Sequence, residues 1–97
     1  MDDALASDLA EIWAYVAVEA SETTATRLLA KINGACDRLP TFPGSGAPRG
    51  QLAAGLRAIF EGNYAVYYLA TDGELILVRV LHGARDAAAI AERGGFA

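Results

Sequence analysis

The sequence predicts an α+β fold, in which an antiparallel pair of N-terminal helices packs on a three-stranded antiparallel meander that is followed by a short C-terminal helix. Apolar residues recur at helical spacing through residues 5–39, whereas residues 56–81 form short β-compatible runs separated by turn signals. A stretch rich in proline and glycine joins these halves and is too short for a domain linker. We therefore expect one domain, 1–97.

Each of the two predicted helices carries one apolar stripe. Ser21 is a suitable N-cap for the second helix, and Glu22 in its first turn complements the helix dipole. Pro40 and Pro43 end that helix. Because only a few residues connect the two helices, they should form an antiparallel hairpin. The stripes contain Leu5, Leu9, Ile12, Trp13 and Val16 in the first helix and Ala25, Leu28, Leu29, Ile32, Cys36 and Leu39 in the second.

The second half of the chain reads as three strands and a helix. Gly62-Asn63 and Asp72-Gly73 are two-residue turn signals, and the second predicts a type I′ turn. The last strand is apolar on both faces apart from Arg79, which predicts a central or covered position. Phe42, in the preceding loop 40–49, is expected to anchor that loop on the core. The predicted strands are 56–61, 64–69 and 74–81, and the predicted terminal helix is 85–92.

Charge and composition exclude several functions. The chain has 12 acidic residues against 8 lysines and arginines, a net charge of −4, which disfavours direct binding of nucleic acid by this protein alone. Seven acidic and three basic residues lie in 1–48, a local balance of −4. No apolar run reaches the roughly 20 residues that span a bilayer, so the expected location is the cytoplasm and no membrane partner is expected.

No cofactor or metal site is expected from the sequence. Cys36 is the one cysteine and His82 the one histidine, which rules out multi-cysteine and multi-histidine metal sites within one chain. Cys36 lies on the apolar stripe of a helix and is interpreted as a packing residue rather than a nucleophile.

Polar side chains gather where the last strand ends, at Arg79, His82, Arg85 and Asp86. His82 has two interpretations. It either caps the sheet edge through a hydrogen bond, which the residues alone favour, or it acts as a general base or a contact at an open site. Asp86 suits the N-terminal dipole of the helix that follows.

Two arginines, Arg57 and Arg79, lie in strands among apolar neighbours. An unpaired buried charge is costly, so each must reach solvent or pair with a carboxylate, and Glu61 and Asp86 are candidates. If both lie on the sheet face that the helices leave open, they form a cationic patch suited to a phosphate, a base or an acidic peptide. Isolated ion pairs on a solvated face are an equal alternative. The tyrosines interleaved with such a patch would be Tyr64, Tyr67 or Tyr68.

Motifs spread over nearly the whole chain resemble the ParE branch of the ParE/RelE toxin superfamily of bacterial toxin–antitoxin operons. The closing motif together with its strand is the most specific of them. They are Ser7-Asp8-Leu9 with Ile12-Trp13 and Tyr15; Leu39 with Phe42-Pro43, Gly46 and Pro48-Arg49; Gly55-Leu56-Arg57; Gly62-Asn63-Tyr64 with Val66 and Tyr68; and Ile76 with the run Arg79-Val80-Leu81-His82-Gly83-Ala84-Arg85-Asp86.

The resemblance implies a RelE/ParE-like toxin, connected with plasmid stabilisation and held inactive in a hetero-oligomer by a cognate ParD-like antitoxin. ParE toxins are associated with inhibition of DNA gyrase, and RelE relatives with ribosome-dependent cleavage of mRNA. The acidic chain favours the gyrase inhibitor, with no catalytic residue assigned. The matching partner-binding positions are Arg57, Tyr68, Arg79, His82 and Arg85.

Two alternatives remain open. If the protein is instead a RelE-like endoribonuclease, then Arg79, His82 and Arg85 would carry acid–base work and phosphate stabilisation. An inactive remnant is the other alternative, because family members usually begin with a strand that 1–4 leave no room for. The missing strand also predicts an exposed sheet edge, which an antitoxin or a second copy would occupy.

Overall fold

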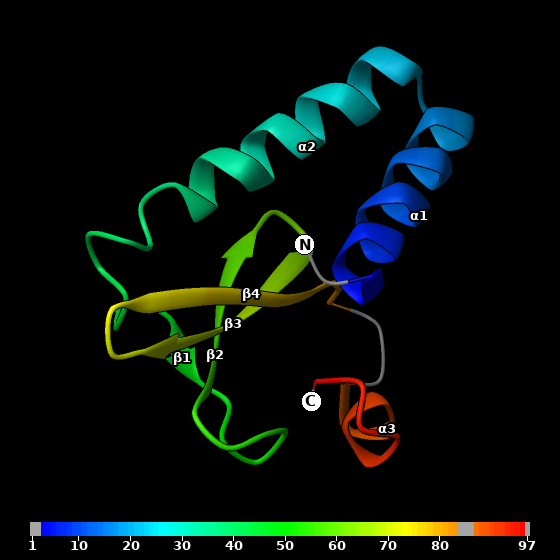
Figure 1. Ribbon diagram of the computed structural model, residues 1–97. Helices are drawn as coiled ribbons and strands as arrows, with labels where there is room; N and C mark the ends of the chain where they lie inside the picture. The colour runs from blue at the N-terminus through cyan, green and yellow to red at the C-terminus, as the bar shows by residue number, and fades with distance from the viewer. Residues whose placement is uncertain (1–2, 84–86, 97) are drawn as a thin grey trace.

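The computed structural model describes residues 3–83 and 87–96 and has the predicted α+β architecture (Figure 1). Two helices precede an antiparallel sheet, and a short helix follows it. The elements are α1 (Asp3–Glu19), α2 (Glu22–Cys36), β1 (Ala47–Pro48), β2 (Leu56–Glu61), β3 (Tyr64–Thr71), β4 (Glu74–His82) and α3 (Ala87–Glu92).

The sheet has four strands in the order β1-β2-β3-β4, one more than the sequence predicts. The additional strand β1 lies in the predicted loop and pairs antiparallel with β2, Ala47 opposite Ala58 and Pro48 opposite Arg57. Two residues are too few to show an alternating pattern, and proline lacks the N–H of a ladder donor. Proline is nevertheless tolerated here because β1 is an edge strand.

The helical hairpin forms as predicted. Ser21 is the N-cap of α2, and its hydroxyl accepts a hydrogen bond from the Thr24 amide at 3.0 Å. The two helices meet at one corner and run back across the sheet, α1 against β4 and α2 against β2 (Figure 1). The indole of Trp13 on α1 donates to the Thr26 hydroxyl on α2 at 3.2 Å, which ties the hairpin together. Among the described helices, none is both long and apolar enough to cross a membrane.

Apolar side chains fill both faces of the sheet. The helix-side core packs beneath α1 and α2, whereas the C-terminal core packs against α3 on the opposite side (Figure 1). The sheet is therefore covered in part on its second face too, in agreement with the two apolar faces of the last strand. The helix-side core contains Leu5, Ile12, Ile32, Tyr64, Val66 and Val80, and the C-terminal core contains Leu56, Ala58, Ala65, Tyr67, Val78, Leu81, Ile90 and Phe96.

A bulge in β4 changes which face its residues use. Tyr67 pairs with Arg79 but Tyr68 pairs with Leu77, so Val78 is an additional residue on β4. Without the bulge, Val78 and Val80 would share a face. Instead Val78 lies in the C-terminal core and Val80 in the helix-side core. The bulge thus sets the direction of Arg79, which lies directly opposite Tyr67.

Each hairpin turn has one glycine with a positive φ, at its first central position in Gly62-Asn63 and at its second in Asp72-Gly73. Gly62 has φ 58° and Gly73 has φ 75°, and no non-glycine residue in the described chain has a positive φ. A type I′ turn requires positive φ at both central residues, so the type I′ prediction at Asp72-Gly73 is wrong. Asp72 keeps a negative φ, and Gly73 alone supplies the left-handed position.

Candidate functional site

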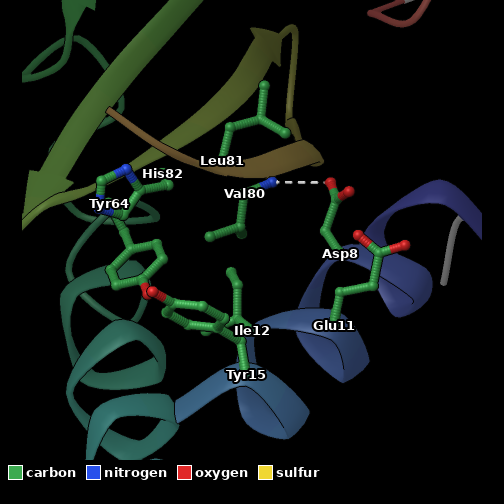
Figure 2. Close-up of a pocket in the computed structure, with 8 residues that line it drawn as sticks. All are labelled: Asp8, Glu11, Ile12, Tyr15, Tyr64, Val80, Leu81 and His82. Atoms are coloured by element: carbon green, nitrogen blue, oxygen red, sulfur yellow. Dashed lines mark hydrogen bonds between the residues drawn. The ribbon is translucent and has the colours of Figure 1, made fainter. Parts of the chain in front are cut away.

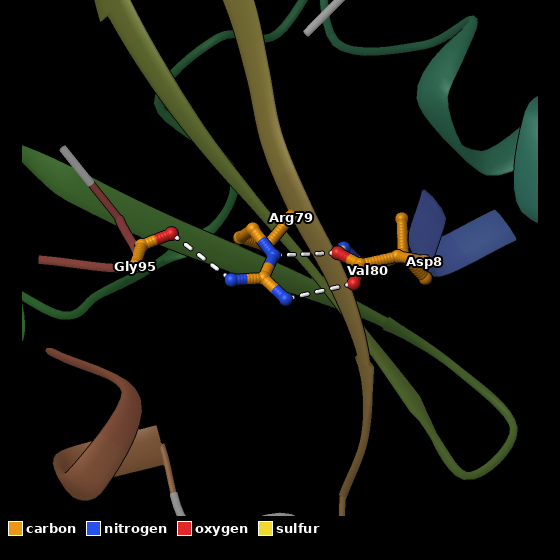
Figure 3. Close-up of polar contacts among 4 residues, drawn as sticks. All are labelled: Asp8, Arg79, Val80 and Gly95. Carbon is orange, nitrogen blue, oxygen red and sulfur yellow. Dashed lines mark hydrogen bonds and ion pairs between the residues drawn. The ribbon is translucent and has the colours of Figure 1, made fainter. Parts of the chain in front are cut away.

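An ion pair at the β4 edge of the sheet joins Arg79 to Asp8 (Figure 3). Arg79 Nε donates to Asp8 Oδ2 at 2.7 Å and Nη2 donates to Oδ1 at 2.8 Å, a bidentate arrangement. The third guanidinium nitrogen, Nη1, donates to the Gly95 carbonyl at 3.2 Å. The side chain of Arg79 is only 16% exposed and that of Asp8 only 6%. Asp8 therefore takes the place expected for Glu61 or Asp86, and Asp86 lies outside the described residues.

Asp8 also closes part of the sheet edge. Its Oδ2 accepts a hydrogen bond from the Val80 amide at 3.1 Å (Figure 2), in addition to the one from Arg79. The expected open edge is thus already capped at Val80 by a side chain of α1. We call Asp8, Arg79, Val80 and Gly95 the edge clasp, because they connect α1, β4 and the C-terminal segment.

A hollow of about 470 Å³ lies beside the edge clasp, between α1 and the end of β4 (Figure 2). The rings of Tyr15 and Tyr64 point toward each other across it, and Tyr15 is 63% exposed. His82 is exposed and meets Tyr64 edge-on, with ring centroids 5.3 Å apart. Burial, and to a lesser extent the neighbouring Tyr15, raises the pKa of Tyr64 above that of an ordinary tyrosine. The α1–β4 hollow is lined by Asp8, Glu11, Ile12, Tyr15, Tyr64, Val80, Leu81 and His82.

Tyr68 and Arg57 hold the loop between α2 and β2. The Tyr68 hydroxyl donates to the Pro43 carbonyl at 2.8 Å and accepts from the Gly46 amide at 2.9 Å. Arg57 Nη1 donates to the carbonyls of Gly44 at 3.3 Å and Gly46 at 2.8 Å. A Cβ on Gly46 would collide with the Tyr68 hydroxyl, so this close approach requires glycine. These contacts give both side chains a structural role.

A comparison with protein-family models matches residues 1–87 to the ParE toxin of the parDE type II toxin–antitoxin system. The chain belongs to this family. The match covers the helical hairpin and the sheet of this ParE toxin, together with the edge clasp's Asp8, Arg79 and Val80. A comparison with curated proteins found no match. Membership of a type II system implies that an antitoxin protein is the partner of this toxin.

The toxin's predicted site residues do not form one patch. Leu56 and Ala58 lie in the C-terminal core, so Arg57 between them points to the helix side, as does its cross-strand partner Tyr68. Arg79 lies on the opposite face, where its cross-strand partner Tyr67 joins the C-terminal core. The single cationic patch considered above is therefore absent from the described residues.

The structure describes four of the five predicted partner-binding positions of the ParE toxin. Tyr68 was predicted as a partner-binding position, but its side chain has no exposed surface and therefore does not reach a partner directly. Arg57 is half-buried and bonded to loop carbonyls, whereas His82 is exposed at the α1–β4 hollow. Arg85 lies outside the described residues. Among those residues, no group of three histidine, cysteine or acidic side chains is placed to hold a metal ion.

Asp8 and Tyr15 belong to the first motif of the resemblance, but the sequence analysis assigned neither of them to the site. Asp8 follows Leu5 by three residues and precedes Ile12 by four, so it lies on the buried stripe of α1. A carboxylate on such a stripe needs a buried donor, and this signal was available in the sequence. Tyr15 carries no comparable signal, because an exposed aromatic residue on a helix is not unusual.

Cys36 of the toxin should react slowly with thiol reagents. Burial, and then the neighbouring Asp37 carboxylate, raises the pKa of this thiol above its ordinary value. Less thiolate is then present at any given pH, so the midpoint of the rate profile with iodoacetamide should lie at higher pH than for N-acetylcysteine. The urea-unfolded toxin is the control and should show the ordinary midpoint. A folded-state midpoint at or below the ordinary value would contradict this assignment.

Proposed function

We propose that this toxin inhibits DNA gyrase by binding it, and that a ParD-like antitoxin neutralises the toxin by forming a hetero-oligomer with it. Membership of the family identifies the protein as a toxin of a type II system and implies that an antitoxin exists. We choose gyrase over the ribosome because the chain has a net negative charge and because the Arg79 guanidinium is already bonded within the protein.

The observation that carries this proposal is the engagement of the Arg79 guanidinium. Its Nε, Nη1 and Nη2 all donate to protein acceptors in the edge clasp. A ribonuclease that stabilises a phosphate with Arg79 would have to separate it from Asp8, leaving a buried carboxylate without its partner at a cost of about 3–5 kcal/mol. The net charge of −4 also opposes binding to RNA. Arg79 is better suited to position α1 than to contact substrate.

The α1–β4 hollow is the surface we assign to gyrase. It is mostly apolar, and the exposed Tyr15 lines it opposite Tyr64. Tyrosine is enriched among the residues that dominate protein–protein binding energies. His82, at the strand end, contributes a polar contact to the same surface. We keep Arg57 and Arg85 as further partner-binding positions in this proposal, with Tyr68 and Arg79 as residues that support the surface from within.

Replacing Tyr15 with alanine should weaken inhibition of gyrase about 10- to 30-fold, the range expected for an aromatic residue at the centre of an interface. The measurement is the toxin concentration that halves supercoiling by purified gyrase. Val18→Ala is the matched control, since Val18 is an 83% exposed residue of the same helix and does not line the hollow. Equal loss in both variants, or no loss in Tyr15→Ala, would contradict the assigned surface.

Expression of the toxin without antitoxin distinguishes the targets. A gyrase inhibitor should produce DNA breaks and an SOS response, whereas a ribosome-dependent nuclease should stop translation and leave cleaved mRNA. His82→Ala should leave most of the toxicity in the first case and abolish it in the second, because acid–base catalysis depends on one group more than a contact surface does. Growth that is unaffected by the wild-type toxin would refute both activities.

A further inference from the structure

A second hollow, of about 560 Å³, lies at the other edge of the sheet, between the C-terminal end of α2, the loop that follows it and strands β1 and β2. We call it the β1 cleft. The strand order places it at the opposite end of the sheet from β4 and the edge clasp. Its walls include Leu39, Phe42, Ile59 and Phe60, with Arg38 and Ser45 as polar members.

Two exposed phenylalanines line this cleft. Phe42 is 63% exposed and Phe60 is 58% exposed, although both are large apolar side chains. The expectation that Phe42 anchors its loop on the core is therefore wrong. The loop is held instead by Tyr68 and Arg57, through Pro43, Gly44 and Gly46. Since other residues fix the loop, Phe42 is left available at the surface, where adjoining apolar side chains mark sites of interaction.

The charged side chain that lines the β1 cleft is cationic, and a second arginine adjoins it. Arg38 is the charged member of the described lining, and the Arg49 guanidinium lies over the Phe60 ring, 5.8 Å from its centroid. Residues 1–48, by contrast, have a balance of −4. Cationic side chains beside an apolar cleft attract a carboxylate-bearing ligand and select against a basic one.

We propose that the β1 cleft binds an acidic segment of a partner protein, which inserts an apolar side chain between Phe42 and Phe60 and places carboxylates beside Arg38 and Arg49. The segment binds through its side chains rather than by adding a strand, because Pro48 on the edge strand β1 has no N–H to donate. Nucleic acid fits less well, since the protein is acidic overall. This second docking surface does not depend on gyrase being the toxin's target.

The test uses purified full-length toxin and a fluorescein-labelled, C-terminally amidated peptide of sequence Glu-Asp-Leu-Phe-Asp-Glu, followed by fluorescence anisotropy. We expect saturable binding that weakens at least tenfold in Arg38→Glu and in Phe60→Thr. Arg27→Glu and Ile76→Thr are the matched controls, because both residues are exposed and neither lines the cleft. Thermal unfolding followed by circular dichroism verifies that each variant is folded.

Two further ligands test whether the cleft prefers an acidic peptide to a basic peptide or a nucleic acid. The peptide Lys-Lys-Leu-Phe-Lys-Lys should not bind, and an oligothymidylate should bind more weakly than the acidic peptide. Amide shifts of Ser45 and Ala47, which line the cleft, should report the acidic peptide there in NMR spectra. Absence of saturable binding, equal losses in the test and control variants, or preference for the oligothymidylate or the basic peptide would overturn the proposal.

Discussion

Replacing Asp8 with alanine should lower the free energy of unfolding by about 2–3 kcal/mol, measured by urea denaturation. The substitution leaves the Arg79 guanidinium without its anion and the Val80 amide without its acceptor. The guanidinium and the amide both lie in largely buried surroundings, so water cannot fully replace the lost carboxylate. The expected loss is below that of a fully buried pair because the Arg79 side chain retains 16% exposure.

Glu11→Ala is the matched control for Asp8→Ala. It removes the same charge from the same helix, but Glu11 is exposed, so unfolding should change by less than about 0.5 kcal/mol. The double variant Asp8→Ala/Arg79→Met should recover part of the stability lost in Asp8→Ala, because no charge is then left unpaired. If the double variant is less stable than Asp8→Ala, the ion pair is not the main contribution of these residues.

Replacing Tyr68 with phenylalanine should lower the free energy of unfolding by about 2 kcal/mol, since one buried hydroxyl serves two backbone groups. The Gly46 amide loses its acceptor and the Pro43 carbonyl loses its donor, while the ring stays in place. The same variant should free the loop after α2, which native-state hydrogen exchange at Gly46 would detect as loss of protection.

Tyr67→Phe provides the comparison for Tyr68→Phe. Tyr67 is the neighbouring residue of β3 and packs its ring against Phe96, with centroids 4.7 Å apart. This ring contact survives removal of the hydroxyl, so the change in stability should stay below about 0.5 kcal/mol. Equal costs in both variants would show that the hydroxyl bridge to the loop contributes nothing specific.

The order of elements could be predicted because their signals are local. Ser21 caps α2 as its sequence position indicates, and strand 56–61 was predicted with the bounds that the structure has. Strand β1 could not be predicted, because its two residues pair only once β2 lies beside them. The bulge at Val78 was also hidden. Both faces of β4 are apolar, so a shift of one residue leaves the hydrophobic pattern unchanged.

The candidate site depends more on contacts distant in sequence, and there prediction failed more often. Arg79 needed a carboxylate, as the sequence indicated, but its partner came from the first helix rather than from a neighbouring strand or turn. Tyr68 matched a family position, yet no local pattern distinguishes a tyrosine whose hydroxyl holds a loop from one that contacts a partner. Phe42 was predicted to anchor its loop on the core. The loop is instead held by Tyr68 and Arg57, whose contacts with it no local sequence pattern indicates.

The edge clasp has a consequence for the order in which the chain folds during synthesis. Asp8 and Arg79 are 71 residues apart, and the Gly95 carbonyl that accepts from Arg79 follows it by a further 16 residues. Helix α1 leaves the ribosome before β4, so its buried Asp8 carboxylate cannot pair with Arg79 until that strand has been made. Nascent chains that stop before Arg79 therefore cannot complete this fold. The edge clasp can therefore form only after α1, β4 and the segment with Gly95 have all left the ribosome.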